Sequence, residues 1–456
     1  MRPSRIAFVA YRGNMRCGGQ GVYLWFLVRE LARLGIEVDV FVGPPYPDPM
    51  PFARAVHRLP NRQFWAQWFT RDWNAMFPER NLHALSPLHF YELAASRIGF
   101  LPEPFAFSLR AFHAMTNELR AGARWDLVHD VQCLGYGILG LKALGLPVVS
   151  TVHHPLTVDR RSSLLRDATL RDTLGTMFFY PIGMQSFVAR RLDRVLTSSE
   201  ASAMEIVRDF GVSPERVVNV WNGLDTELYS PAPDSDSELD SKGNSGAPQG
   251  DSELLCVARA NDPNKGVKIL IEALAQLGKA GERATLTLVD DDHRDNPVFR
   301  WARRAGVAER LTVTGRVSTE KLVSLYRRAA LTVVPSLFEG FGLPAVESMA
   351  CGTPVVAADA GALPEVMRLS GGGLVVQRND PAALTKGIST LLGEKQTRHA
   401  LGLRGRRGVV ASLSWASVAE ATAGIYAEVL EERRGRPAST ITSASDGAAR
   451  ATQSTA

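Results

Sequence analysis

The sequence has few cysteines and no long apolar run. Its 456 residues hold four cysteines, far apart, with no C-x-x-C pair and no histidine pair at metal-ligand spacing. This spacing favours neither a disulfide framework nor a zinc site, and predicts reduced, mostly buried thiols of a cytosolic protein. The apolar run Ile6 to Tyr11 is too short for a signal peptide, and no other segment reaches membrane-spanning length without a charge. We therefore expect a cytoplasmic protein. The cysteines are Cys17, Cys133, Cys256 and Cys351.

A strong excess of charge is also missing. The chain carries 52 basic and 47 acidic residues, and a net charge of +5 is mild for this length, so it does not indicate a nucleic-acid partner. Apolar residues make up 45% of the chain, which is ample for packed cores. Because the length exceeds what one core usually holds, the natural expectation is two α/β domains with appendages.

The most informative stretch runs from Leu331 to Asp359. Leu331 to Val334 is an apolar, β-branched run typical of a buried strand. The helix that follows starts with Pro344 and ends before Gly352, an asymmetry expected of real helix termini. Val355 to Ala358 then forms a second strand. The stretch therefore predicts one βαβ unit.

The loop before this helix predicts an anion site. Gly340 and Gly342 let the backbone approach a ligand, and the free N–H groups near Leu343 carry partial positive charge that suits a phosphate. Glu339 in the loop and Glu347, about one turn into the helix, flank that position. An anion site lined by acids fits a ligand with phosphate at one end and hydroxyls at the other, as in a nucleotide sugar.

These residues also carry a family resemblance. The run from Glu339 to Pro344 resembles, with the residues after it, the signature of the family-4 group of retaining glycosyltransferases with the GT-B fold. The resemblance implies two Rossmann-like, doubly wound α/β domains that face each other across an interdomain cleft. It also implies transfer of a hexose from a UDP- or GDP-sugar to a hydroxyl of a glycan, lipid or small molecule, with no metal and no cofactor besides this co-substrate. The residues that follow the run are Glu347, Met349, Ala350, Gly352, Thr353, Pro354 and Val355.

Domain boundaries follow from this resemblance and from composition. Residues 1–230 are expected to form an N-terminal, acceptor-side Rossmann-like domain, and residues 254–413 a C-terminal domain that binds the nucleotide sugar. Residues 231–253 are rich in Ser, Asp, Gly and Pro, which predicts a flexible linker with a disordered insert. By resemblance the helix 414–434 crosses back to the N-terminal domain, and the tail 435–456 is expected to be disordered.

In the N-terminal half, the glycine-rich loop after the first strand is the first candidate site. Its spacing does not fit G-x-G-x-x-G, although the opening βαβ pattern keeps a dinucleotide site as an alternative. In the resembled family this loop, here at Gly18 and Gly19, faces the donor sugar and diphosphate, and we favour that interpretation.

A histidine ends a later strand of the same half. His153 follows the apolar run from Pro147, at the edge where α/β proteins place ligands. The Thr-Val-His run resembles the family strand whose histidine contacts the donor sugar, so the resemblance assigns a catalytic role to His153. The adjacent His154 is a second candidate for that role, and a purely structural histidine is the alternative. His129 is interpreted as structural.

In the C-terminal half, Arg259 and Lys265 follow the first strand. Two cations at this position suit a diphosphate clamp, and the family carries an Arg and a Lys here, although Ala258 replaces a usual glycine. The donor site implied by the resemblance is completed by the backbone at Phe341, Gly342 and Leu343, by Glu347 on the ribose, and by Glu339 as the catalytic residue that holds the sugar hydroxyls.

One turn departs from the family pattern. Asp290, Asp291 and Asp292 stand where the family usually has glycines. Triple aspartate after a strand also resembles the metal site of the other glycosyltransferase fold, GT-A. We favour the metal-free interpretation because Arg259 and Lys265 already offset the phosphate charge.

Residues 61–112 are rich in aromatic side chains. Trp65, Trp68 or Phe69, and Trp73 fall on one helical face, which predicts either packing on the N-terminal sheet or an acceptor or membrane-docking surface at the cytoplasmic face of a membrane.

Two alternatives to transfer also stay open. One is a related GT-B enzyme, such as a nucleotide-sugar epimerase or a phosphorylase, and the other is a non-catalytic sugar-nucleotide binding module.

Overall fold

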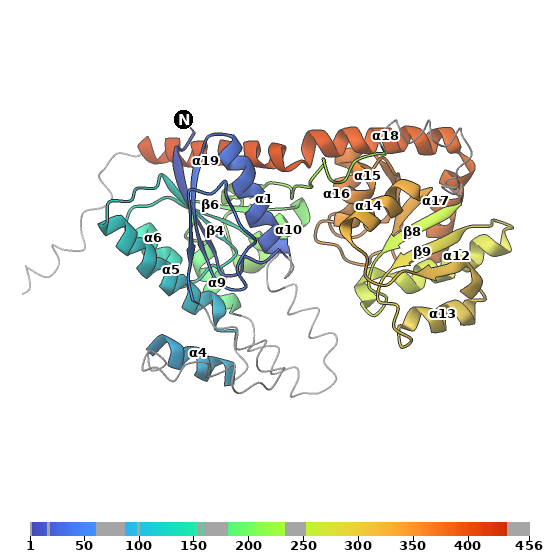
Figure 1. The fold of residues 1–456 in the computed structure, drawn as a ribbon, viewed down its shortest axis with the longest axis horizontal. Helices are drawn as coiled ribbons and strands as arrows, with labels where there is room; N and C mark the ends of the chain where they lie inside the picture. The colour runs from blue at the N-terminus through green and yellow to red at the C-terminus, as the bar shows by residue number, and fades with distance from the viewer. Residues whose placement is uncertain are drawn as a thin grey trace, which may run out of the picture.

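Two parallel sheets organise the chain, each at the centre of its own domain. The computed structural model describes residues 2–15, 19–60, 87–97, 101–153, 157, 181–232 and 252–435. The predictions made for Gly18 and His154, for the tryptophans of 61–86, for most of the linker and for the tail lie outside these ranges. Figure 1 shows the two domains side by side, with the last two helices lying along them.

The first sheet has seven strands in the order β3-β2-β1-β4-β5-β6-β7, and all its pairings are parallel. Strand β1 is buried from Ile6 to Ala10, because helices cover both faces of a parallel sheet. The strands are β1 (Arg5–Ala10), β2 (Glu37–Val42), β3 (Ala55–Arg58), β4 (Leu127–Val131), β5 (Val148–Thr151), β6 (Arg194–Thr197) and β7 (Val217–Asn219).

Helices connect these strands and cover the sheet. The helical stretch after β6 consists of α10 (Glu200–Glu205) and a π-helical turn at Ile206–Phe210, and Gly211 ends it in the left-handed conformation. The α-helices are α1 (Gly19–Arg33), α4 (Pro87–Arg97), α5 (Glu103–Arg120), α6 (Tyr136–Ala143), α9 (Ile182–Ala189) and α10 (Glu200–Glu205), and a 3-10 turn lies at Pro214–Arg216.

The second sheet has six parallel strands in the order β10-β9-β8-β11-β12-β13. It begins at Glu253, the last residue of the predicted linker. The strands are β8 (Glu253–Val257), β9 (Thr285–Val289), β10 (Leu311–Val313), β11 (Leu331–Val334), β12 (Val355–Ala358) and β13 (Gly373–Val376). The helices are α12 (Val267–Lys279), α13 (Pro297–Ala305), α14 (Thr319–Arg328), α15 (Leu343–Ala350), α16 (Leu363–Ser370), α17 (Pro381–Gly393), α18 (Lys395–Ser412) and α19 (Trp415–Arg434), with 3-10 turns at Pro263–Lys265 and Ala308–Arg310.

The chain crosses between the domains twice. After β7, Leu224 and Tyr229 pack against apolar residues of the second domain. The return crossing runs beside the first, where the Leu224 N–H donates to the Leu413 carbonyl at 2.7 Å. Helix α19 then packs Trp415 and Tyr426 into the core beneath the first sheet. The last helix is therefore a structural part of the N-terminal domain, as Figure 1 shows.

Cys133, Cys256 and Cys351 are free and buried, as predicted for them, whereas Cys17 lies outside the described residues. Within the described ranges, no helix combines the length and the apolar character needed to cross a lipid bilayer.

Candidate functional site

Sheet topology brings the predicted residues to two loop clusters. In each sheet the strand order reverses beside the first strand of the domain, between β1 and β4 and between β8 and β11. Ligands of open α/β sheets bind outside the carboxyl ends of the strands at such a switch point. Arg259 and Lys265 follow β8 and Glu339 follows β11, so the loops of the second switch point carry all three.

The predicted phosphate clamp and the predicted catalytic acid are in direct contact. Lys265 Nζ lies 2.9 Å from Glu339 Oε2, and the Ser336 hydroxyl donates to the same oxygen at 3.0 Å. Backbone contacts join the two loops as well, since the Leu337 N–H donates to the Asn264 carbonyl at 2.7 Å. The fold thus brings a cation and an acid that are 74 positions apart in the sequence into contact. The role of Ser336 was not predicted from the sequence.

The start of α15 has the geometry predicted for a phosphate seat. Gly342 is the N-cap with φ of 90°, a conformation that favours glycine, and no side chain caps the helix. Phe341 is buried in the core, whereas the Leu343 side chain is exposed. At Phe341 only the backbone is therefore available to a ligand, while the N–H groups of the first turn keep their partial positive charge.

Arg259 and the aspartate turn lie on the neighbouring strands. The Arg259 side chain is exposed just beyond β8. Asp290 Oδ2 accepts hydrogen bonds from the Ala260 N–H at 2.7 Å and from Asn296 Nδ2 at 2.8 Å. Across the described ranges, no three His, Cys, Asp or Glu side chains are grouped closely enough to hold a metal ion. Asp290 thus has a structural role, because it holds the loop that carries Arg259.

Two tyrosines hold Glu347. The Tyr326 hydroxyl donates to Glu347 Oε2 at 2.8 Å, and the Tyr229 hydroxyl also donates to this carboxyl group. Burial raises the pKa of Glu347, and the two hydroxyls partly offset this effect. Tyr229 comes from the interdomain crossing and Tyr326 from α14, so no local pattern in the sequence predicts this contact. Glu347 lies one turn into α15, the helix whose start is the predicted phosphate seat.

His153 lies just beyond β5 and is held by several residues. Its N–H donates to Gln132 Oε1 at 3.0 Å, and its ring meets the Tyr23 ring edge-on at 4.8 Å. Gln132 has φ of 51°, which is uncommon for a residue other than glycine and is found preferentially at functional sites. Gly19 begins α1, with open space where a side chain would lie. The structure thus places His153 and Gly19 in the first domain, at the carboxyl ends of its strands.

A buried polar network lies beneath His153. The His129 ring contacts Thr151 Oγ1 at 2.7 Å through Nε2 and the Tyr426 hydroxyl at 2.5 Å through Nδ1, and Tyr23 Oη lies 2.8 Å from the same Thr151 oxygen. Burial, with a smaller effect of His153, lowers the pKa of His129 to about 3. His129 is thus a neutral residue with both ring nitrogens engaged, in keeping with a structural role.

Beside this network, burial raises the pKa of Asp130 to about 7. Its Oδ2 accepts hydrogen bonds from the Ser150 hydroxyl at 2.8 Å and from the Leu134 N–H at 3.1 Å, whereas no polar group in the described ranges pairs with Oδ1. An acid of this kind takes up a proton near neutral pH. The sequence showed only an Asp near a strand end.

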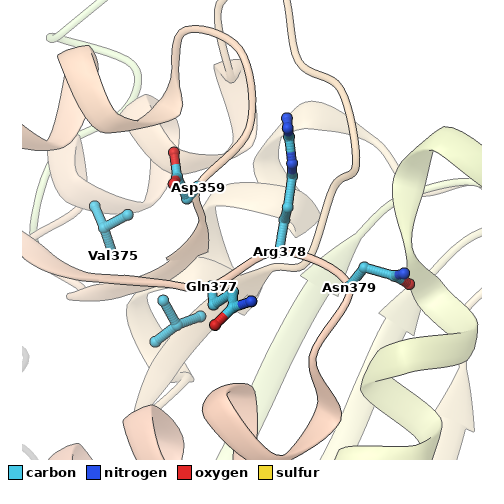
Figure 2. A pocket seen from close by; sticks show the side chains of 6 residues that line it. Asp359, Val375, Gln377, Arg378 and Asn379 are labelled. Carbon is cyan, nitrogen blue, oxygen red and sulfur yellow. The ribbon is translucent and has the colours of Figure 1, made fainter.

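A polar hollow lies at the same edge of the second sheet. It has a volume of about 600 Å³ and is lined by the end of β13 and by residues that follow β12 and β13. Figure 2 shows Asp359 on the chain leaving β12, and Arg378 and Asn379 on the chain leaving β13. These loops meet only because β12 and β13 pair in parallel, and sequence reasoning did not identify them.

Comparison with known sequences gives two family matches. Residues 17–228 match Glycosyltransferase Family 4, and residues 238–408 match Glycosyl transferases group 1. The chain is 36% identical to the MMP alpha-(1->4)-mannosyltransferase of Mycolicibacterium hassiacum, over 93% of this chain and 98% of that protein. It is 30% identical to a D-inositol 3-phosphate glycosyltransferase of Acidothermus cellulolyticus, over 95% of this chain and 92% of that protein.

Solved structures share the architecture. Sucrose-phosphate synthase from Thermosynechococcus elongatus aligns with a TM-score of 0.65 at 22% identity, covering 94% of this chain and all of that one. The Anabaena protein HepE in complex with UDP aligns with a TM-score of 0.63 at 19% identity, covering 93% of this chain and all of that one. These likenesses concern the fold, and with the two parallel sheets they confirm the predicted GT-B architecture.

Proposed function

This chain belongs to glycosyltransferase family 4, and from that premise we propose that it transfers a hexose from a nucleoside diphosphate sugar to a hydroxyl group with retention of the anomeric configuration. The observation that carries the proposal is the contact of Lys265 with Glu339 beside the uncapped start of α15. A cation, an acid and a helix N-terminus at one switch point suit a diphosphate joined to a sugar.

The hard step is departure of the diphosphate. Lys265, Arg259 and the N–H groups around Gly342 stabilise the negative charge that grows on the leaving group. Preorganised donors of this kind contribute about 3 kcal/mol each where they have been measured. Glu339 provides a counter-charge that holds Lys265 in position. Binding of the donor turns Lys265 toward phosphate and frees Glu339 for the sugar hydroxyls.

The remaining residues position the rest of the donor. Glu347 binds the ribose hydroxyls, and the hydroxyls of Tyr326 and Tyr229 orient its carboxyl group. His153 and Gly19 reach the sugar from the first domain when the domains close. The acceptor hydroxyl attacks on the face from which the diphosphate leaves, and a diphosphate oxygen takes its proton. This route retains the configuration and uses no metal ion.

Mannose is our first candidate for the hexose. The relative that is 36% identical is named as an alpha-(1->4)-mannosyltransferase, and it is matched over nearly its full length. An α product is what retention gives from an α-linked sugar nucleotide. We therefore propose a mannosyl donor and a sugar hydroxyl as acceptor. The inositol phosphate named in the more distant relatives is the second candidate acceptor.

A donor and acceptor panel tests the proposal. The full chain is incubated with GDP-mannose, UDP-glucose and other nucleotide sugars, each with and without an oligomannoside or inositol phosphate acceptor, and products are identified by NMR. The expected result is an α-linked product that needs both substrates. An altered sugar nucleotide without any acceptor would identify an epimerase instead. Release of a sugar phosphate from a glycan and inorganic phosphate, with no nucleotide sugar present, would identify a phosphorylase.

Binding without turnover of any pair would favour the non-catalytic module. The only sequence feature that favours this alternative is the departure from the family pattern at Asp290, and in the fold that side chain holds the neighbouring loop.

We also propose that the aromatic segment 61–112 contacts a lipid surface. Phe90 on α4 has 71% of its surface exposed, whereas an aromatic side chain packed in a core is mostly buried. The assay is flotation with anionic vesicles of phosphatidylglycerol, using the wild type and variants of Trp65, Trp68 and Phe90. Binding that weakens in the variants supports the contact, whereas no binding by the wild type leaves a packing role alone.

A further inference from the structure

Helix α16 of the second domain contacts α10 of the first through a carboxylate. Glu365 Oε2 accepts the Glu200 N–H at 2.8 Å, and Oε1 accepts the Ala201 N–H at 3.0 Å. These are the first two N–H groups of α10, which have no partner within their own helix. Their partial positive charge strengthens a bond to a carboxylate. One side chain therefore satisfies two backbone groups across the domain boundary.

A second contact between the two helices lies beside the first and is an exposed ion pair. Arg368 NH2 lies 3.1 Å from Glu200 Oε1, but these two side chains are 70% and 57% exposed. Exposed ion pairs contribute little, because water screens the charges. Glu365 is partly buried, and burial raises its pKa while the two backbone donors partly offset that effect. The contact of Glu365 with the helix start is thus the stronger link.

On the side of the first domain, this contact reaches His153. Ser199 caps α10, and the hydroxyls of Ser198 and Ser202 at the same helix start donate to the His153 carbonyl at 3.4 and 3.3 Å. These serines are almost fully buried, so they have little freedom to move independently of the helix. Buried side chains therefore join the start of α10 to the backbone of His153.

On the side of the second domain, the contact reaches Glu339. The Ala362 N–H, at the start of α16, donates to the Glu339 carbonyl at 2.9 Å. Gly361 has φ of 55°, and a Cβ there would lie 2.0 Å from the same carbonyl oxygen. The loop of Glu339 and the first turn of α16 are therefore packed as one unit, and Glu365 extends from that unit toward α10.

We propose that Glu365 is a positioning residue that sets the placement of His153 relative to Glu339 by binding the first N–H groups of α10. It touches neither substrate, and it acts through the backbone on both sides. The proposal rests on the proposed function for its kinetic consequences, although the link between the domains exists independently of that function. It predicts that loss of the contact slows transfer while leaving nucleotide binding, which uses the second domain, unchanged.

The test uses paired variants of the full chain. Glu365→Gln removes the charge, and Glu200→Pro removes one N–H donor at the first helical position, where proline is tolerated. Ser199 before it is already extended, with φ of −162°, as a residue before proline requires. Glu200→Ala and Arg368→Ala are the controls, because each removes the exposed ion pair and keeps the backbone donor.

Three readouts decide the result. We expect kcat to fall about tenfold in Glu365→Gln and Glu200→Pro, with the Kd for nucleoside diphosphate within twofold of the wild type. Small-angle X-ray scattering with nucleoside diphosphate bound should show a larger radius of gyration in both. The controls should match the wild type in all three measurements.

Several outcomes would overturn the proposal. Unchanged kcat and scattering in Glu365→Gln and Glu200→Pro would show that the link has no effect. An equal loss in Glu200→Ala would assign the effect to the ion pair, and a parallel loss of nucleotide affinity would assign it to folding of the second domain. If the wild type transferred no sugar, the proposed function would fail, while the scattering comparison would still test the link.

Discussion

Lys265→Ala gives the sharpest test of the proposed donor site. The Lys265 side chain is 31% exposed and its Nζ lies 2.9 Å from Glu339. For stability, a partly exposed pair of this kind contributes about 0.5 kcal/mol, so Tm should change by no more than about 2 °C. For catalysis, loss of one donor to the leaving group costs about 3 kcal/mol, which corresponds to about a hundredfold lower kcat.

The assay is release of nucleoside diphosphate with saturating acceptor, together with thermal unfolding of the same preparations. Lys268→Ala is the matched control, because Lys268 lies three residues away, is 65% exposed and sits 3.9 Å from Glu272. Glu339→Gln should also slow turnover, and the double variant should lose less than the sum of the two, because the residues interact. Turnover within threefold of the wild type in both single variants, or an equal loss in Lys268→Ala, would refute the assignment.

Three further predictions concern other parts of the molecule. Burial raises the pKa of Asp130 to about 7, so between pH 4 and 7 the folded state keeps a proton that the unfolded chain has lost. The protein therefore loses about 1.4 kcal/mol of stability per pH unit as the pH rises through this range. Asp130→Asn should remove that slope, which Tm measured from pH 5 to 8 would reveal; parallel curves for the two proteins would contradict it. Tyr426→Phe should lower the free energy of unfolding by about 1 to 3 kcal/mol in urea titrations, since it leaves the buried His129 Nδ1 without its partner. Transfer activity should be unchanged by EDTA, and loss of activity that Mg²⁺ or Mn²⁺ restores would overturn the metal-free mechanism.

Some elements of this protein follow from local sequence. Leu331–Val334 and Val355–Ala358 are strands as predicted, and α15 between them is bounded by the signals at Pro344 and Gly352. Ser414 caps α19, the helix expected at 414–434, and a serine before an apolar helical pattern is a usual N-cap. These features depend on the backbone conformations of neighbouring residues, so the local sequence is enough to predict them.

Helix α18 was not predicted, and its composition explains why. It contains three glycines, which lower helix propensity. In the folded protein Gly402 lies against the Gly352 carbonyl and Gly405 against the Gly372 Cα, so the absent side chains allow close packing on α15 and α16. Tertiary contact therefore stabilises a helix that local preference does not favour.

The sequence alone determined the fold class, the family signature and the chemical types at the donor site, because those depend on periodicity, turn residues and short motifs. Only the tertiary structure decided which groups meet. The pairing of Lys265 with Glu339, the hydrogen bond of Tyr326 to Glu347 and the contact of Glu365 with Glu200 of α10 join residues that are 74, 21 and 165 positions apart. Such contacts arise from strand order and domain packing, which no local pattern encodes.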